Sequence, residues 1–197
     1  MQVGNKPRSN QSRTDATRSA LLAAARELFS SKGFADTSTP DIVKAAGLTR
    51  GALYHHFADK EALFRAVVVN EYVQVAADID ASATAQPTSA LEALRQGSRG
   101  FLEAMDDPGR VRLMLLDGPV VLGMAELSKI DRETSTDSLR LGLAAAMDSG
   151  ELKTLPIDAL TVQLSALFDR AALAISEGDN RDEHLAVLDS LFTALST

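Results

Sequence analysis

The sequence predicts an all-α protein with a small N-terminal domain and a larger C-terminal domain. Apolar residues recur at helical spacing along most of the 197 residues, and no stretch alternates with the period of two that marks a β-strand. Apolar residues make up 45% of the chain, and the helix formers Ala and Leu dominate among them. Glycines, prolines and capping residues between the apolar stretches divide the chain into separate helices.

The N-terminal residues 1–11 are polar, and we expect them to form a flexible tail. The first helix begins near Ser12 or Thr14, since either residue can cap it. It ends at Gly33, a residue suited to a left-handed C-cap. One face of this helix is apolar and carries Leu21, Leu22, Ala25, Leu28 and Phe29.

A short second helix carries Ile42 and stops at Gly47. The sequence allows two starting points for this helix. Either Thr39 caps it with Pro40 at the first helical position, or Thr37 caps it with Pro40 inside the first turn.

A tight turn at residues 47–49 leads to a third helix of about two turns, Arg50 to His56, which Thr49 caps. Leu53 and Phe57 face inward from it. Residues 12–58 are therefore expected to form a helix-turn-helix domain, because a Gly-containing turn between two short helices is typical of that motif.

Asp59 caps a fourth, connecting helix over residues 59–81, and residues 82–88 form the expected hinge. Residues 82–197 then form the second domain, with a break at Asp117-Gly118-Pro119. Its expected helices are 89–106, 108–116, 124–149, 157–177 and 181–195.

The charge is distributed unevenly along the chain. Its formal net charge is −7, yet residues 1–60 contain nine Lys or Arg and five Asp or Glu, a net charge of +4. The remainder therefore carries −11. A basic module joined to an acidic body can bind a polyanion at one end.

The third helix suits the major groove of DNA, where a recognition helix presents its N-terminal residues to base edges. Arg50 can donate two hydrogen bonds to guanine, and Ala52 can contact a thymine methyl group. Gly51 is small enough for close approach of the backbone. Tyr54, His55 and Lys60 lie toward the flanks, where phosphates pass.

The segment from Thr37 to Leu63, which includes Leu-Tyr-His-His-Phe and Asp-Lys-Glu-Ala-Leu, resembles the DNA-binding region of the tetracycline-repressor (TetR) family. The resemblance is strong over about residues 14–67. It implies about nine helices, of which the first three bind DNA. It implies that Thr37, Tyr54 and Lys60 hold phosphates, and that the groove-facing residues are Thr49, Arg50, Gly51, Ala52 and His55.

The resemblance also implies a homodimer built from the last two long helices and a ligand pocket in the second domain. Both helices carry wide apolar faces, as expected where a partner helix pair packs. The residues predicted for the dimer interface are Leu160, Leu164, Phe168, Leu188, Leu191, Phe192 and Leu195. Those predicted to line the pocket are Phe101, Met105, Met114, Leu115, Met124 and Phe168.

From these features we expect a ligand-responsive transcriptional regulator that binds a palindromic operator as a homodimer. The resemblance implies that it is a repressor, as most members of the family are. A small-molecule effector, apolar or aromatic, releases it. The alternatives are a catalytic helical bundle, for which the sequence offers no motif, and a protein-binding adaptor, against which Arg50 and Lys60 argue.

Neither a metal site nor a cofactor is expected. The chain has no Cys, and the adjacent His55 and His56 diverge by about 100° around a helix. No uninterrupted apolar run reaches the roughly 18 residues of a membrane span, so we expect a cytoplasmic protein without a membrane partner.

Overall fold

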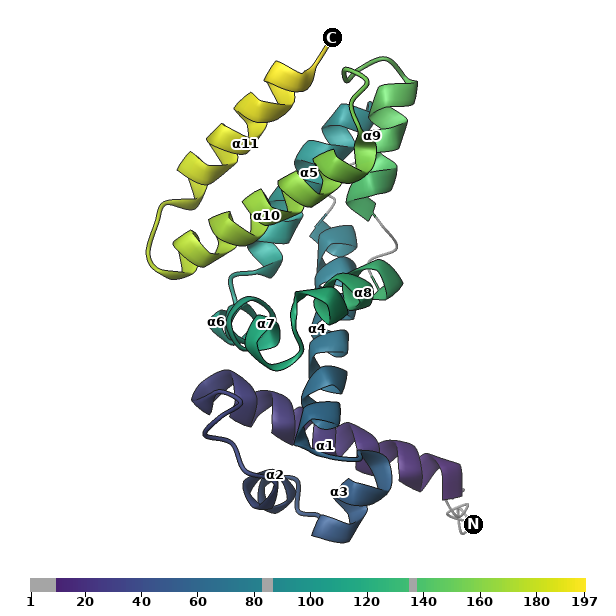
Figure 1. The fold of residues 1–197 in the computed structure, drawn as a ribbon, viewed down its shortest axis with the longest axis vertical. Coiled ribbons are helices and arrows are strands. Elements are labelled where there is room, and N and C mark those ends of the chain that lie inside the picture. The colour runs from purple at the N-terminus through teal and green to yellow at the C-terminus, as the bar shows by residue number, and fades with distance from the viewer. Residues whose placement is uncertain (1–9, 83–86, 135–137) are drawn as a thin grey trace, which may run out of the picture. The chain divides into compact units, whose positions relative to one another are not determined.

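The computed structural model describes residues 10–82, 87–134 and 138–197. Over these ranges the helices α1 to α11 and the π-helix η1 form ten separate helical runs, and no strand is present (Figure 1). One isolated β-bridge joins Leu152 and Ser196. The all-α prediction is confirmed, with one helical run more than the resemblance implied.

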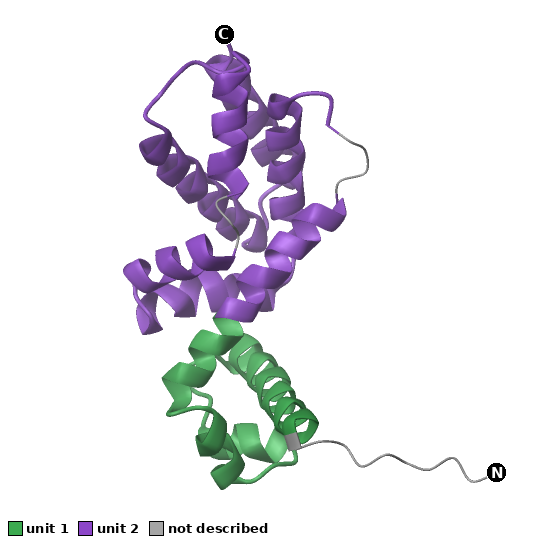
Figure 2. Ribbon diagram, turned by 90° about the vertical axis from the view of Figure 1, so that its right-hand side faces the viewer, with its two compact units in different colours: residues 1–68 green, residues 69–197 purple. Residues whose placement is uncertain are grey.

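The chain divides into two compact units, unit 1 up to Val68 and unit 2 from Val69 onward (Figure 2). The helix α4 (Lys60–Ser82) contributes residues to both units. It matches the expected connecting helix to within a residue at each end. Of the expected hinge, residues 83–86 lie outside the described residues.

Unit 1 consists of α1 (Asn10–Lys32), α2 (Thr39–Ala45), α3 (Arg50–His56) and the start of α4. The helix α1 starts at Asn10, before the expected Ser12 or Thr14, and residues 1–9 of the expected tail lie outside the described residues. Gly33 ends it with a φ of +87°, as predicted.

Three phenylalanine rings form the centre of unit 1. Phe29 and Phe64 are fully buried with centroids 5.2 Å apart, and Phe34 lies 5.1 Å from Phe64. Because α1, α2 and α3 all contact one another, this small core holds the three helices together.

The start of α2 corrects both registers expected from the sequence. Ser38 is the N-cap, and its hydroxyl accepts a hydrogen bond from the Asp41 amide at 3.3 Å. Thr39 is thus the first helical residue and Pro40 the second. In this position the missing Pro40 N–H leaves no helical hydrogen bond unmade.

Unit 2 contains the rest of the chain. Its helices after α4 are α5 (Ala90–Ala104), α6 (Pro108–Val111), η1 (Arg112–Asp117), α7 (Gly118–Val121), α8 (Met124–Thr134), α9 (Ser138–Asp148), α10 (Ile157–Ser176) and α11 (Arg181–Leu195). The helices α9 and α11 pack on α5, and α10 packs on α5, α6 and α9. The single helix expected over 124–149 is therefore two helices, with residues 135–137 outside the described residues.

The break expected at Asp117-Gly118-Pro119 is wrong, because α6, η1 and α7 continue without interruption. The Gly118 amide donates to the carbonyl of Leu113, five residues back, so the turn before Pro119 is a π turn. A Cβ at Gly118 would lie 2.9 Å from that carbonyl oxygen. The wide turn therefore requires glycine here, and it lets the chain pass a proline without ending the helix.

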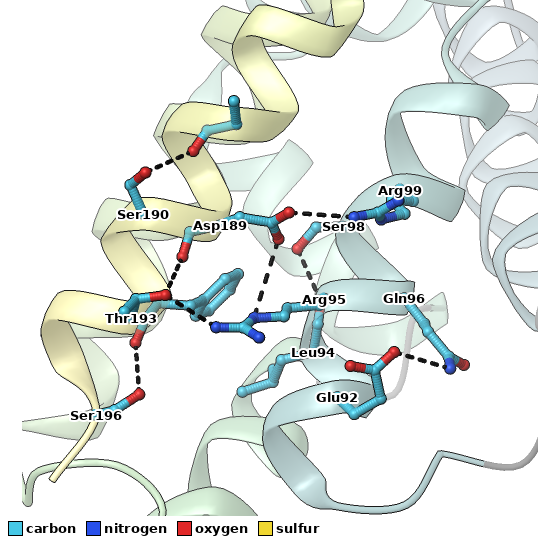
Figure 3. A network of polar contacts seen from close by, with 12 residues as sticks. Glu92, Leu94, Arg95, Gln96, Ser98, Arg99, Asp189, Ser190, Thr193 and Ser196 are labelled. Atoms are coloured by element: carbon cyan, nitrogen blue, oxygen red, sulfur yellow. Dashed lines mark hydrogen bonds and ion pairs between the residues drawn. The ribbon is translucent and has the colours of Figure 1, made fainter.

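Polar contacts join α5 to α11 (Figure 3). The Arg99 guanidinium donates to the Asp189 carboxylate at 3.1 Å, and Arg95 donates to the Thr193 hydroxyl at 3.0 Å. These side chains are partly exposed to solvent, so the ion pairs add little stability and mainly set which faces of the two helices meet.

A buried ion pair joins α6 to α4 within unit 2. Arg110 Nε donates to Glu71 at 3.1 Å, and Arg110 Nη1 donates to Asp78 at 2.9 Å and to the Ala104 carbonyl. Arg110 and Glu71 retain only 9% and 3% exposure. One guanidinium thus binds two carboxylates that are two turns apart on α4.

Candidate DNA-binding site

The N-terminus of α3 is set by its turn and its cap. Gly47 adopts a φ of +65°, and the Leu48 amide donates to the Val43 carbonyl at 2.9 Å, which closes the end of α2. The Thr49 hydroxyl then accepts from the Ala52 amide at 3.2 Å and caps α3 as the sequence predicted.

The two faces of α3 differ sharply. Leu53 and Phe57 are 0% and 5% exposed and anchor the helix in unit 1. The predicted groove-facing residues lie on its other sides: Thr49, Arg50, Gly51 and His55 are exposed, and Ala52 is half-buried. The structure therefore brings these residues together on one accessible surface.

Gly51 has no role in the fold that the structure reveals. It is helical without a positive φ, and a Cβ placed on it would meet nothing closer than the Thr49 hydroxyl at 3.9 Å. Glycine inside a helix costs about 0.5 to 1 kcal/mol relative to alanine. Its absent side chain leaves room for the close approach of another molecule.

Tyr54 lies one turn after Arg50 and is 44% exposed. The Arg50 Cζ atom lies 5.5 Å from the centroid of its ring. Hydrogen bonds from the side chains of Thr39 and Arg50 lower the pKa of the Tyr54 phenol.

A surface hollow of about 440 Å³ adjoins Tyr54. It is lined by residues 35–40, Tyr54, Asp59 and Lys60. Its lining includes the hydroxyl residues Thr39 and Tyr54 and the cation Lys60, together with the carboxylates Asp36 and Asp59. The Ser38 hydroxyl, which also belongs to the lining residues, donates to the Asp41 carboxylate at 2.6 Å.

Thr37 does not reach this surface with its side chain, contrary to the expectation that it holds a phosphate. It is 1% exposed, and its hydroxyl donates to the carbonyls of Gly33 at 2.7 Å and Leu28 at 3.2 Å. The hydroxyl ties the loop to the end of α1. Thr39, for which the sequence predicted only a capping role, lines the hollow together with Tyr54.

Lys60 has a structural role that the sequence did not indicate. Its Nζ donates to the carbonyls of Phe34 at 2.8 Å and Thr37 at 3.0 Å, and lies 4.0 Å from the Phe34 ring centroid. Two of its three N–H groups are therefore engaged by backbone carbonyls inside unit 1.

The residues predicted to line a ligand pocket lie mostly in the core of unit 2. Met105, Met114 and Phe168 are buried there, with Phe101 and Leu115 packed against them, and the rings of Phe101 and Phe168 are 5.8 Å apart. Met124 is 64% exposed at the start of α8, so it does not belong to this cluster.

Two polar side chains of unit 2, Asp169 and Tyr72, were not predicted from the sequence to have a special environment. Burial and the neighbouring Asp131 carboxylate raise the pKa of Asp169 to about 6. Burial, Asp131 and Asp169 together also raise the pKa of Tyr72. These groups lie on α4, α8 and α10, so the interior of unit 2 is less purely apolar than the sequence suggested.

Four of the residues predicted for the dimer interface face the core of their own chain instead. Leu164, Phe168, Leu188 and Phe192 are between 1% and 7% exposed. Leu160 and Leu195 are half-buried against the same core, and Leu191 is 37% exposed. The outward apolar residues of α10 and α11 are Val162, Leu167, Val187 and Leu191, at 69%, 44%, 59% and 37% exposure.

Two further properties bear on the class of site. Within the described ranges, no group of three or more His, Cys, Asp or Glu side chains could hold a metal ion. One helix there, α10, is long and apolar enough to be a membrane span by length and composition alone. It contributes Leu164, Phe168 and Ala171 to the core of unit 2.

Family profiles match both parts of the chain. Residues 21–67 match the tetR family of bacterial regulatory proteins, and residues 91–196 match the tetracyclin repressor-like C-terminal domain. The chain belongs to the TetR family of transcriptional regulators.

Individual relatives agree with this assignment. The HTH-type transcriptional regulator UidR of Escherichia coli strain K12 is 43% identical over 61 residues, and the match spans 31% of either chain. The HTH-type transcriptional repressor AcnR of Corynebacterium glutamicum is 29% identical over 95% of this chain and 93% of its own.

Solved structures show the same fold. A TetR-family regulator from Pectobacterium atrosepticum is 31% identical, with a TM-score of 0.74 over 96% of this chain and 98% of its own. A TetR-family regulator from Shewanella, at 24% identity, superposes with a TM-score of 0.76 over 92% of this chain and 98% of its own.

Proposed function

We propose that the protein is a homodimeric transcriptional repressor that binds a palindromic DNA operator through α3 and leaves it when a small molecule binds unit 2. The observation that carries the proposal is the exposed surface of α3, with Leu53 and Phe57 anchored beneath it. A capped helix of two turns fits the major groove. The name of AcnR, a repressor that aligns over 95% of this chain, supports repression as the mode of regulation.

Each residue of this surface has a proposed role. Arg50 donates two hydrogen bonds to the O6 and N7 atoms of a guanine, and Ala52 contacts a thymine methyl group. Gly51 lets the backbone approach the groove. Thr49 and His55 lie at the edges of this contact.

Phosphate contacts hold the helix in the groove. Tyr54 and Thr39, which carry hydroxyl groups, line the hollow beside α3, and Lys60 supplies a positive charge with two of its three N–H groups bound to carbonyls. Residues 1–60, with a net charge of +4, attract the DNA backbone, while the acidic remainder of the chain is repelled from it.

The dimer forms through the outward faces of α10 and α11. Exposed Val162, Leu167, Val187 and Leu191 form the apolar part of a surface that can pair with its own copy around a two-fold axis. Two α3 helices then occupy half-sites about 34 to 36 Å apart, which is why the operator is palindromic.

The effector binds in unit 2, beside the cluster of Phe101, Met105, Met114, Leu115 and Phe168. These side chains suit an apolar or aromatic molecule. The protein needs no metal or cofactor for this role, catalyses no reaction and acts in the cytoplasm.

The helix α4 transmits effector binding, because it contributes residues to both units. The buried ion pair of Arg110 with Glu71 fastens α6 to α4 within unit 2. An effector that displaces α6 therefore also displaces α4 through this ion pair. A typical allosteric coupling of about 1 to 3 kcal/mol is enough to release the operator.

Binding to DNA tests the proposal directly. The full-length protein is titrated against labelled DNA flanking its own gene and against random DNA, over a salt series, with selection from a random pool as the second source of sites. The proposal predicts a palindromic consensus bound by a dimer. Selection that enriches no sequence at all would overturn it.

A further inference from the structure

The Arg50 guanidinium lies over the ring of Tyr54. The two residues are four apart on α3, so they occupy the same side of the helix one turn from each other. The guanidinium carbon lies 5.5 Å from the ring centroid, within the range of a cation–π contact. Both side chains are exposed, so core packing does not force this arrangement.

The side chains of Thr39 and Arg50 also act on the Tyr54 hydroxyl, and together they lower the pKa of the phenol. Thr39 is the first residue of α2 and Arg50 the first residue of α3. The phenol therefore lies between the starts of both helices of the helix-turn-helix.

We propose that Tyr54 is a positioning residue for Arg50: its ring holds the guanidinium in place at the N-terminus of α3, so Tyr54 sets sequence specificity through Arg50. The inference rests on the proposed role of Arg50 in base reading. An arginine held by an aromatic ring loses less freedom on binding than one that samples many rotamers.

This role can be measured separately from the phosphate contact proposed for the Tyr54 hydroxyl. Loss of a phosphate contact weakens binding to all sequences alike and reduces the salt dependence. Loss of Arg50 positioning lowers the ratio of specific to random affinity. It has no further effect on that ratio once Arg50 itself has been removed.

The first experiment is a double-mutant cycle on the full-length protein. Affinities for the selected operator and for random DNA are measured for the wild type, Tyr54→Leu, Arg50→Ala and the double variant. We expect Tyr54→Leu to reduce the specific-to-random ratio by about two- to five-fold, the size of an exposed cation–π contact, and to leave it unchanged in the Arg50→Ala background. Tyr54→Phe, which keeps the ring, should retain most of the ratio.

Equal losses on both DNAs, of the same size with and without Arg50, would overturn the inference and leave Tyr54 as a phosphate contact. If the wild type fails to discriminate between the two DNAs, the proposed function itself fails, and that result comes before any variant is compared. Because Tyr54 is exposed, its variants should keep the wild-type melting temperature.

The second experiment needs no DNA. The chain has two tyrosines, Tyr54 and Tyr72, and their pKa values move in opposite directions, so their ionisations separate in an ultraviolet titration. We expect the first step, from Tyr54, to move to higher pH in Arg50→Ala. The matched control Lys44→Ala removes an exposed charge from α2 and should leave the step in place. An unmoved step in Arg50→Ala would contradict the contact.

Discussion

Arg110 donates a hydrogen bond of 3.1 Å from Nε to the Glu71 carboxylate, and both side chains are buried in unit 2. Removal of one partner from such a pair leaves the other charge buried and uncompensated, at a cost of about 3 to 5 kcal/mol. Glu71→Ala should therefore lower the free energy of unfolding by that amount in urea denaturation. Asp78→Ala, which removes the exposed second carboxylate, should cost about 1 kcal/mol or less. If both variants lowered the free energy of unfolding by the same amount, the buried pair with Glu71 would contribute no more to stability than the exposed pair with Asp78.

Gly51 should show a trade-off between stability and DNA binding. Gly51→Ala removes a helical glycine with open space around it, so the protein should gain about 0.5 to 1 kcal/mol of stability. The added methyl group should at the same time weaken operator binding. Gly97→Ala in α5, where a Cβ meets nothing within 4 Å, is the matched control and should stabilise without loss of DNA affinity. A Gly51→Ala variant with full operator affinity would show that α3 does not approach DNA at this residue.

Asp169 should make the protein less stable as the pH rises. Burial raises its pKa from 3.8 to about 6 in the folded state, so the folded protein holds this proton more tightly than the unfolded chain. Its contribution is fully present below about pH 4 and is lost as the pH rises through 6. At about 1.4 kcal/mol per pKa unit, Asp169→Asn should be more stable than the wild type by up to about 3 kcal/mol at pH 8.

Thermal unfolding of both proteins from pH 4 to pH 8 checks the Asp169 prediction. The difference between them should grow with pH and level off above pH 7. A constant difference across that range would mean that Asp169 does not titrate there.

Glu151 should have the opposite pH dependence. It accepts hydrogen bonds of 3.2 Å from the amides of Ala90 and Leu91 at the start of α5, and 2.8 Å from the Ser149 hydroxyl. Contacts of this kind, with Ser89 contributing most, lower its pKa from 4.5 to about 2. Its stabilising effect is present above pH 4.5 and is lost as the pH falls toward 2. Glu151→Gln should therefore remove part of the acid sensitivity, which unfolding curves between pH 2 and pH 6 would measure. An acid transition unchanged in Glu151→Gln would contradict the stabilising role of the hydrogen bonds that Glu151 accepts at the start of α5.

The outward faces of α10 and α11 should control the oligomeric state. Val187→Glu or Val162→Glu places a charge in the proposed interface and should convert the dimer to a monomer in light scattering coupled to gel filtration. Operator affinity should fall with it, because each monomer holds a single half-site. Val120→Glu, which changes an 85% exposed apolar residue of α7, should remain dimeric. A dimer that survives both interface changes would place the interface elsewhere.

The sequence predicted the local structure of the DNA-binding unit well. Thr49 as a cap, Gly33 and Gly47 as helix ends and Leu53 as an anchor all follow from short-range rules, and the structure confirms each of them. The predicted start of α2 was wrong because Thr37, Ser38 and Thr39 are all residue types that cap helices well. Only the contacts of the folded loop choose between them.

Roles that depend on tertiary contacts could not be predicted in the same way. The carbonyl partners of Lys60 belong to a loop some 25 residues earlier, and nothing in the local sequence places them. Helical spacing identified Leu164 and Leu188 as apolar-face residues, yet spacing does not say whether a face covers its own core or a partner. Glu71 did leave a signal, because it interrupts the buried series of Val67, Val68 and Val75 on α4.

The most direct test of the account is the effect of Arg50→Ala on binding to the selected operator and to random DNA. If α3 reads the major groove through Arg50, the variant should lose about 1 to 3 kcal/mol on the operator, lose its preference at one base pair of each half-site, and bind random DNA almost as the wild type does. Equal losses on operator and random DNA, with the base preference intact, would reduce Arg50 to a phosphate contact and contradict the proposed reading of sequence by α3.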